Sequence, residues 1–429
     1  MAPQLTEVHV FEDLLTPESL SALMRSTWTW DDRALRRDLA ALLVDLSGAR
    51  NAAADDKTAD HAETLRARAL AAGAEFVANV LGPGLIADAG NPMRGQFAAD
   101  AVDPARFVRD ASSAFARVQE CSTRYVEPPV YPPESSWLTL LSTDGHRGLA
   151  SAMRAYGYHL HGSGFFATAG LAWQTLVAIG DESTQSVEYT KAIESCSISA
   201  TLAAAEQSGS WDPALVRTKA VRGASDWQLS GTKLFVPAAD DADMLLVMAR
   251  SIAGPSLFAV ERSAPGLHVI PLSVVDDTRP LYGIELADTP ATLLGAEGAG
   301  GRLMMTAIDL ASTALAAEQV GLIEKAIHLL APAAESEQMA EVTLNHVAAA
   351  SLWRHALAEQ TAGSAGFSAA AAAAHIGCSR AAVRSATAAA AVVGPSTETD
   401  ALLRRSLSAN LLFGGPALSH ERLLERLGV

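Results

Sequence analysis

The side chains that could transfer a proton to or from a substrate are spread along this chain instead of forming one motif. Two histidines, His159 and His161, flank a glycine segment at Gly162 and Gly164. A flexible backbone there would allow an imidazole to face a substrate, since histidine titrates near neutral pH. The alternative is an ordinary polar loop. The histidines form no cluster with acidic or sulfur ligands, so no metal site is expected.

Glycine-rich loops are the usual way for a backbone to cradle phosphates, and one such segment is present. Gly295–Gly301 contains four glycines. A dinucleotide fold would need a strand before this loop, a helix after it and a later acidic residue in a βαβ unit, and the surrounding pattern does not supply these. No GxxxxGK[ST] phosphate loop occurs. A Rossmann domain and a P-loop enzyme are therefore not expected.

Composition narrows the possible partners and the compartment. The 429 residues carry a formal net charge of −16, which would repel a nucleic acid backbone. Cys121, Cys196 and Cys378 are far apart without CxxC spacing, so we expect no disulfide framework or zinc site, and a reducing cytoplasm fits. The N-terminal stretch lacks the basic region of a secretory signal, and no apolar run reaches the ~18 residues of a membrane span.

The elements that would position these residues change type twice along the chain. Thr16-Pro17 is a favourable helix start, and apolar residues recur at helical spacing in Leu35–Leu46 and Ala62–Leu81. The prolines of Pro128–Pro133 favour extended chain and indicate a boundary. Helical spacing returns over residues 136–196, with a break predicted at Gly157–Gly164.

A strand-rich region follows, from about Ser197 to Leu294, where apolar and polar residues alternate between turn signals. The clearest candidates are Met244–Met248, Ser256–Val260 and Leu267–Ile270. From Arg302 onward the spacing is helical again. The order helical, β, helical predicts an antiparallel barrel or sandwich between two helical regions.

Three motifs in the strand-rich region resemble those of the acyl-CoA dehydrogenases. The family's TEPGAGSD motif corresponds to AEQSGSWD at Ala205–Asp212. The hairpin motif W-x-L-x-G-x-K-x-F corresponds to Trp227–Phe235, and LGxxGxG before a long helix corresponds to Leu294–Gly300. Near the end of the chain, Leu403–Arg405 and Leu411–Gly414 fit the family's last helix. The motifs occur in the family's order.

This resemblance implies an α+β fold of the acyl-CoA dehydrogenase type. The expected segments are a divergent helical extension over residues 1–130, the remainder of an N-terminal helical domain over 131–196, a central β-domain over 197–295 and a C-terminal bundle like a four-helix bundle over 296–429. The family's members are usually dimers or tetramers, so a homo-oligomer, or a hetero-oligomer with a sister chain of the same family, is expected.

The resemblance also implies FAD as the cofactor, held partly by the β-domain. The residues that match the family's contacts in this half are Glu206, Ser208, Ser210, Phe235, Val236 and Pro237. Ala205 replaces a threonine that bonds the flavin, and Pro237 stands where the family usually has a hydroxyl. Because proline has no N–H, Pro237 offers only its carbonyl oxygen.

The helical half departs further from the family. The arginine of the family's RxQFGxPI motif binds the FAD pyrophosphate across a dimer interface, but His328–Glu335 contains no arginine. That loss would remove a charge-assisted contact of about 1.5–3 kcal/mol. The HGGxGF motif falls near Thr387–Pro395, where only Gly394 is reminiscent of it. Retention of FAD is therefore an open expectation.

Neither usual position of the family's catalytic carboxylate holds an acid. One aligns with Phe413 and the other with Ala311. The remaining candidates are Asp309, which could instead cap a helix start or lie on the surface, and Glu398, which aligns with an acidic element of many relatives. Glu398 could instead be a helix-cap acid before Leu402–Leu407.

Three functions stay open from the sequence. The first is FAD-dependent α,β-dehydrogenation of an acyl thioester carried by coenzyme A or an acyl carrier protein, with His159, His161 and Gly162 near the acyl pocket. The second is a flavin-poor, non-catalytic subunit of a heteromeric acyl-CoA dehydrogenase. The third is a flavin-independent enzyme on the same fold in a biosynthetic pathway. Fold alone does not decide among them.

Overall fold

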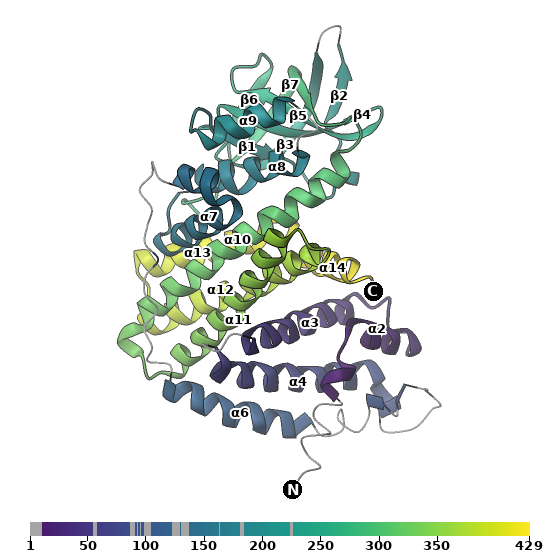
Figure 1. Cartoon of the computed structure of the whole chain (residues 1–429), viewed down its shortest axis with the longest axis vertical. Helices are drawn as coiled ribbons and strands as arrows, with labels where there is room; N and C mark the ends of the chain where they lie inside the picture. Colours follow the sequence, from purple (N-terminus) through teal and green to yellow (C-terminus); the bar gives the residue numbers. More distant parts are fainter. Residues whose placement is uncertain are drawn as a thin grey trace.

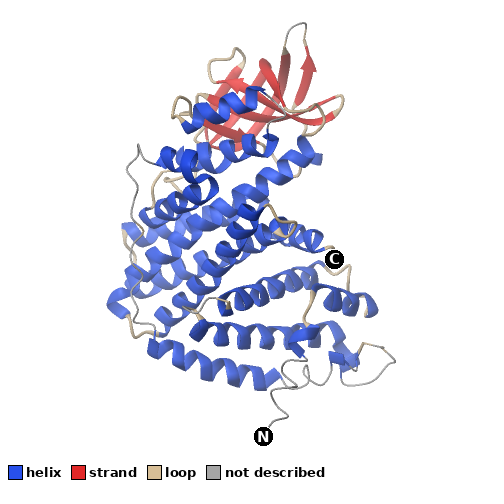
Figure 2. Cartoon of the chain, in the orientation of Figure 1, coloured by secondary structure: helices blue, strands red, loops and turns tan. Residues whose placement is uncertain are grey.

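The described residues form three tiers. The computed structural model describes residues 11–54, 58–85, 91, 93, 94, 96, 97, 104–121, 129, 137–162, 164–180, 184–223 and 226–429. A β-barrel lies at one end, a helical bundle in the middle and a layer of N-terminal helices at the other end (Figure 1). Figure 2 shows all the strands gathered in the first tier. The order helical, β, helical confirms the predicted α+β class of the acyl-CoA dehydrogenase type.

The N-terminal layer begins where the sequence predicted. The Thr16 hydroxyl accepts the Ser19 N–H at 3.2 Å and caps the first helix, with Pro17 in its first turn. Asp32 caps the next helix by accepting the N–H groups of Ala34 and Leu35. The elements are α2 (Pro17–Ser26), α3 (Arg33–Ala53), α4 (Ala59–Leu81), η1 (Gly82–Leu85) and α6 (Pro104–Cys121). The boundary predicted at Pro128–Pro133 lies outside the described residues except for Pro129.

A second helical segment leads into the barrel. It consists of α7 (Trp137–His159), the π-helix η2 (Phe166–Trp173), α8 (Gln174–Ile179) and α9 (Thr184–Glu194). The break predicted at Gly157–Gly164 is wrong for Gly157, which lies within α7. Tertiary packing explains the difference, because a side chain at Gly157 would overlap the backbone of a neighbouring helix.

The strands close on themselves as a barrel. They are β1 (Ala200–Ala203), β2 (Lys219–Arg222), β3 (Trp227–Pro237), β4 (Met244–Ser251), β5 (Gly254–Glu261), β6 (Leu267–Pro271) and β7 (Leu281–Leu294), with the 3₁₀ turn η4 (Pro213–Leu215) between β1 and β2. Pairs β4–β5, β5–β7, β7–β3, β3–β2 and β2–β4 complete the ring. The predicted barrel is confirmed. Most pairs are antiparallel, but β1 and β2 each run parallel to β4. Strand β3 comes between β2 and β4 in the sequence and runs antiparallel to β2, so it returns the chain to the end of the barrel from which β4 starts.

Strand β4 shows why the sequence specifies this arrangement. It is apolar almost throughout, whereas a strand with one wet face would alternate. Leu245 and Val247 point into the barrel core, while Met244, Leu246 and Met248 join the larger core shared with the helices. Both faces of the strand are therefore dry, and the barrel is fixed on the bundle.

The C-terminal bundle is built around one buried helix. Its elements are α10 (Gly300–Leu330), η5 (Ala331–Ala333), α11 (Glu337–Ala362), α12 (Phe367–Val393), α13 (Thr397–Leu411), η6 (Leu412–Gly414) and α14 (Gly415–Leu427). Helix α10 starts beneath the barrel and packs against α7, α11 and α12. It is apolar on most of its circumference, as expected for a helix surrounded by protein.

The N-terminal layer covers the opposite side of the bundle. Helix α3 packs against α11, α12 and α14, and α6 packs against α11. The predicted extension over residues 1–130 is thus part of the same packed body within the described residues. Among those residues, no helix is long and apolar enough to cross a membrane.

Two glycines allow α7 and α10 to cross at backbone contact. A Cβ atom on Gly157 would overlap the carbonyl oxygen of Glu318, and one on Gly321 would overlap that of Arg154. Both overlaps involve backbone atoms, which cannot rotate away as a side chain can. The crossing therefore requires glycine at both positions.

We expect Gly321→Ala to destabilise the protein by at least about 1–3 kcal/mol, because the added methyl must push two buried helices apart. Gly301→Ala on the same helix is the matched control. A Cβ there meets nothing within 4 Å, and alanine favours helix by up to ~1 kcal/mol. Urea unfolding of both variants measures the difference. Equal stability of the two variants would show that the crossing tolerates a side chain.

Candidate functional site

Glu206 ties together the start of the barrel. Its carboxylate accepts the N–H of Arg217 at 3.0 Å, the N–H and hydroxyl of Thr218 at 2.9 and 2.8 Å, and the Lys233 ammonium at 2.9 Å. Lys233 is fully buried and also donates to the carbonyl oxygen of Ala204 at 3.1 Å. In the structure the half-buried Glu206 anchors the loop that follows it, and its predicted contact with the cofactor remains a prediction.

The ionisation of this pair follows from its surroundings. Burial acts to raise the pKa of Glu206, but the hydrogen bonds from Lys233 and Thr218 outweigh it and lower the pKa to about 2. Burial lowers the pKa of Lys233 to about 8, against the opposing effect of Glu206. The Glu206 carboxylate is therefore charged at neutral pH and is held by hydrogen bonds from Lys233 and Thr218.

The loop after Glu206 presents two hydroxyl groups. Gly209 adopts φ +69°, and its N–H donates to the Glu206 carbonyl oxygen at 2.8 Å. The hydroxyl oxygen of Ser208 accepts the Ser210 N–H at 3.3 Å, and that of Ser210 accepts the Asp212 N–H at 3.1 Å. Because both hydroxyls act as acceptors from the backbone, each keeps its own hydrogen to donate to a ligand.

Phe235 is held beside this loop by an unusual backbone. It sits at an irregularity of β3 with φ +59°, and its side chain is 42% exposed. Its ring lies against Gly209. Val236 is buried, and the carbonyl oxygen of Pro237 accepts the Thr201 hydroxyl at 2.6 Å. The structure thus brings Ser208, Ser210 and Phe235 together, while Val236 and Pro237 face the interior.

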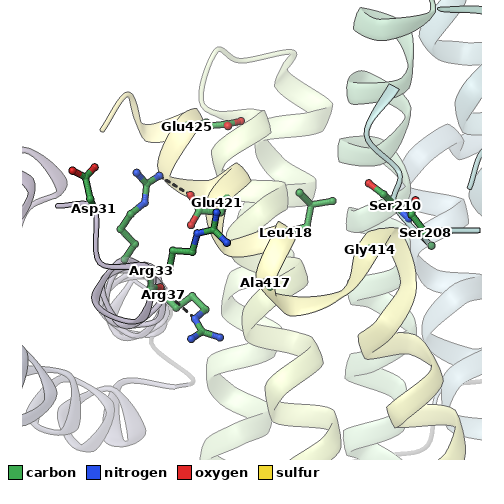
Figure 3. A pocket seen from close by; sticks show the side chains of 12 residues that line it. Asp31, Arg33, Arg37, Ser208, Ser210, Gly414, Ala417, Leu418, Glu421 and Glu425 are labelled. Atoms are coloured by element: carbon green, nitrogen blue, oxygen red, sulfur yellow. Dashed lines mark hydrogen bonds and ion pairs between the residues drawn. The ribbon is translucent and has the colours of Figure 1, made fainter. Parts of the chain in front are cut away.

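A pocket of about 920 Å³ opens beside the loop, between the barrel, α14 and the N-terminal layer. Figure 3 shows that its walls come from three distant parts of the chain. The lining residues are Asp31, Arg33, Arg36 and Arg37 from the start of α3, Ser208, Gly209 and Ser210 from the loop, and Gly414, Ala417, Leu418, Glu421 and Glu425 from α14 and the turn before it.

One ion pair fixes α3 against α14 at this pocket. The Arg36 guanidinium contacts the Glu421 carboxylate at 2.6 Å. It also stacks on the Trp30 ring at 4.7 Å, with Arg25 at the same distance from that ring. No role was predicted for these arginines from the sequence. Their R-x-x-R-R spacing at the start of a predicted helix is visible in the sequence, but it does not show that α14 and its Glu421 lie opposite.

An aromatic cluster occupies the place where the family's base was expected. Phe413, fully buried with φ +59°, meets the Trp211 ring edge to face at 5.1 Å and the His375 ring at 5.6 Å. Arg422 donates to the carbonyl oxygen of Phe413 at 3.1 Å. Burial, with Arg422 nearby, lowers the pKa of His375 to about 4, so this imidazole is neutral at pH 7. The two ring contacts of Phe413 are thus with Trp211 and His375, and neither of these side chains carries a carboxylate.

Glu398 lies in the first turn of α13, where its side chain is 61% exposed and pairs with Lys325 at 2.8 Å. The hydrogen bond from Lys325 lowers the pKa of Glu398. Ser396 and Thr399 form a capping box at the same helix start. This placement favours the helix-cap interpretation, because a base for an α-proton needs a dry pocket and a raised pKa.

The position of Asp309 excludes both structural roles considered for it. It is neither a helix-start cap nor a surface charge, since it lies inside α10 and is buried. Its carboxylate accepts from Arg426 of α14 at 3.3 Å, and burial raises its pKa. The interpretation as a cap failed because a sequence does not show which face of a long helix is covered.

The histidine segment lies at the end of α7. His159 and His161 are exposed, with ring centroids 6.2 Å apart, and Gly162 follows in the loop. A Cβ on Gly162 would meet nothing within 4 Å. None of the three lines the pocket beside Ser208 and Ser210. Their proposed substrate contact remains a prediction.

The residues of the site suit the binding of a flavin nucleotide, but they do not supply the catalytic base that the family resemblance implies. Phe235 offers an aromatic face and Ser208 and Ser210 offer hydroxyl donors next to a pocket of nucleotide size. Pro237 has no N–H and its carbonyl is already bonded to Thr201. The residues present could therefore hold a flavin nucleotide, but the described residues provide no carboxylate at the expected base position.

Comparison with known proteins gives the family context. Residues 201–287 match the family model described as acyl-CoA dehydrogenase, middle domain. A 128-residue stretch is 30% identical to cyclohexane-1-carbonyl-CoA dehydrogenase of Syntrophus aciditrophicus (strain SB), covering 27% of this chain and 33% of the relative. The chain thus matches about a third of the length of that relative.

Solved structures extend the likeness to the whole fold. The butyryl-CoA dehydrogenase of Megasphaera elsdenii is 18% identical with a TM-score of 0.63, and the match covers 73% of this chain and 96% of that chain. The ChsE4-ChsE5 complex from Mycobacterium tuberculosis is 17% identical with a TM-score of 0.59, covering 74% and 88%. At these identities the likeness shows the fold alone.

The Glu206 anchor predicts a pH-dependent stability. Its pKa falls from 4.5 to about 2 on folding, so its contribution is present above about pH 4.5 and is lost as the pH falls towards 2. We expect Glu206→Gln to lower the free energy of unfolding by about 1.5–3 kcal/mol at pH 7. The difference from the unmodified protein should shrink below pH 4.5.

Urea unfolding at pH 7, 5 and 3.5 measures this difference. Glu188→Gln, an exposed position on α9, is the control and should change the free energy by less than about 0.5 kcal/mol. A difference for Glu206→Gln that stays constant over the whole pH range would contradict the anchoring role.

Proposed function

We propose that this chain, which resembles the acyl-CoA dehydrogenases over residues 201–287 and in its fold, works as one subunit of an acyl-thioester oxidoreductase in which a sister chain removes the α-proton of the substrate. The observation that carries this proposal is the aromatic cluster of Phe413, Trp211 and His375 at the expected base position. A buried phenyl ring cannot accept a proton, and His375 beside it is buried, with its pKa lowered to about 4 by that burial.

The chemistry of α,β-dehydrogenation explains why this matters. An α-proton becomes acidic only when the thioester carbonyl is polarised, and the base must then stand within hydrogen-bond reach of it. Of the two acids named from the sequence, Glu398 is exposed and paired with Lys325, and Asp309 is buried with its carboxylate paired with Arg426. A chain with this arrangement needs a partner to complete the reaction.

The contribution of this chain is then to bind the cofactor and to shape the site around it. FAD, when bound, would accept the hydride that leaves the β-carbon of the acyl group. Phe235 would pack against the bound group, and the Ser208 and Ser210 hydroxyls would donate hydrogen bonds to it. The relative from Syntrophus aciditrophicus is named for an acyl-CoA substrate, and the Mycobacterium tuberculosis neighbour is described as a complex, which supports acyl-CoA as the substrate class and a heteromer as the assembly.

A second candidate is a self-sufficient FAD-dependent dehydrogenase. The exposed Phe235 ring beside two hydroxyl donors favours it, because a purely structural subunit has no need to hold a 42% exposed aromatic residue at φ +59°. The two candidates share the cofactor contacts and differ in the source of the base.

We expect the purified chain alone to oxidise no acyl-CoA in an assay with an artificial electron acceptor, since it lacks a base at the reacting carbon. Co-expression with a sister chain that carries a carboxylate at the position equivalent to Phe413 should produce a stable complex that is active. Turnover and complex mass are the measurements. Activity of the chain by itself would replace this proposal with the second candidate.

Glu398→Gln separates the two candidates further. If Glu398 is a surface ion-pair partner, the substitution should change the free energy of unfolding by less than ~1 kcal/mol and leave the activity of the complex unchanged. Lys325→Met removes the other half of the pair and should have the same small effect. Loss of turnover in Glu398→Gln but not in Lys325→Met would identify Glu398 as the base.

A further inference from the structure

We propose that the pocket between α3, the Ser208–Ser210 loop and α14 binds a pyrophosphate group, and that Arg33 and Arg37 of the chain's own N-terminal layer contact it. The family's pyrophosphate arginine is missing from His328–Glu335, at the end of α10. In this chain the cationic wall comes from α3 instead. The inference concerns binding alone and does not depend on which chain supplies the catalytic base.

Arg33 and Arg37 are placed to act together. They stand one helical turn apart on α3 and both line the pocket. The Nε of Arg37 donates to the Arg33 carbonyl oxygen at 3.3 Å, which holds it close to its neighbour. Within the described ranges neither guanidinium forms an ion pair. Two like charges at this spacing repel each other, and a bound anion would convert that repulsion into attraction.

Arg36 has a different role in the same wall. Its guanidinium is already engaged by the Glu421 carboxylate and the Trp30 ring. That engagement locks the first turns of α3 against α14 and so sets the position of Arg33 and Arg37. Arg36 is therefore a positioning residue, while the other two arginines keep their donors for a ligand.

The facing wall supplies complementary donors. Ser208 and Ser210 both retain a hydroxyl hydrogen, as their oxygens already accept backbone N–H groups. The turn at Gly414 and the first turn of α14 complete this side, with the positive end of the helix dipole towards the pocket. Guanidinium groups, hydroxyls and a helix start are the groups that proteins use to bind phosphate oxygens.

The acidic residues of the pocket restrict where an anion can lie. Glu421 is neutralised by Arg36. Asp31 and Glu425 lie towards one end of the pocket in Figure 3, and Arg37 lies towards the other. A pyrophosphate would therefore occupy the end near Arg37, and Ala417 and Leu418 would offer an apolar surface to the organic part of the ligand.

The size of the pocket fits a nucleotide. About 920 Å³ is at the upper end of the range for small-molecule sites. An adenosine diphosphate group is common to FAD and to coenzyme A, so both could present the same pyrophosphate to Arg33 and Arg37. The proposed ligand group is therefore a pyrophosphate, and experiment can distinguish whether FAD or coenzyme A supplies it.

Isothermal titration calorimetry with ADP and with inorganic pyrophosphate tests the proposal on the full chain. We expect binding that weakens with added salt, because the contacts are ionic. The double substitution Arg33→Glu and Arg37→Glu should weaken binding at least about tenfold. Arg109→Glu, a single charge reversal of the same kind at an exposed position of α6, should leave it unchanged.

A milder variant guards against loss of structure. Arg33→Gln with Arg37→Gln removes both charges without adding new ones, and thermal unfolding checks that each variant is folded. Competition then identifies the source. FAD and coenzyme A are each titrated against bound ADP, and the one that displaces ADP at the lower concentration is assigned to the site. No binding of any probe at millimolar concentration, or equal binding by the folded double variants, would overturn the proposal.

Discussion

The arrangement of this protein depends on one buried carboxylate that two arginines share. Glu318 of α10 contacts Arg279, in the loop between β6 and β7, at 2.5 Å and Arg405 of α13 at 2.7 Å, and all three side chains are fully buried. Arg405 also donates to Thr278 of the same loop, and Arg279 lies over the Phe166 ring. Removing one partner from such a group typically costs about 3–5 kcal/mol, because a charge is left buried and unpaired. The barrel, α10 and α13 are thereby held in one fixed relation.

That fixed relation decides what the surface between barrel and bundle can do. The loop at Ser208–Ser210 is anchored to the barrel by Glu206, and α14 is anchored to the bundle, so the space between them has a defined shape. Helix α3 closes the third side through Arg36 and Glu421. The candidate site is therefore a composite of three units, each rigid for its own reason. The aromatic cluster of Phe413, Trp211 and His375 packs at the same junction.

The parts of the site that could be predicted are those encoded locally. Ser208, Ser210 and Phe235 belong to short motifs on one loop and one strand, and the strands around them have the pattern of an antiparallel barrel or sandwich. Asp309 was misjudged because a continuous helix does not reveal which of its faces is covered. Arg33 and Arg37 were passed over because a cationic cluster at a helix start is, by itself, an ordinary solvent-exposed feature.

The sequence alone determined the order of helical and β segments, the helix start at Thr16-Pro17 and the strand at Met244–Met248, since these follow from propensity and periodicity over short stretches. Only the tertiary structure decided that Gly157 remains helical, that Glu318 gathers two arginines and that α3 faces α14. Those outcomes are contacts between residues far apart in the chain. Their energy comes from burial and from pairing of charges at specific distances, and neither quantity is defined until the chain has folded.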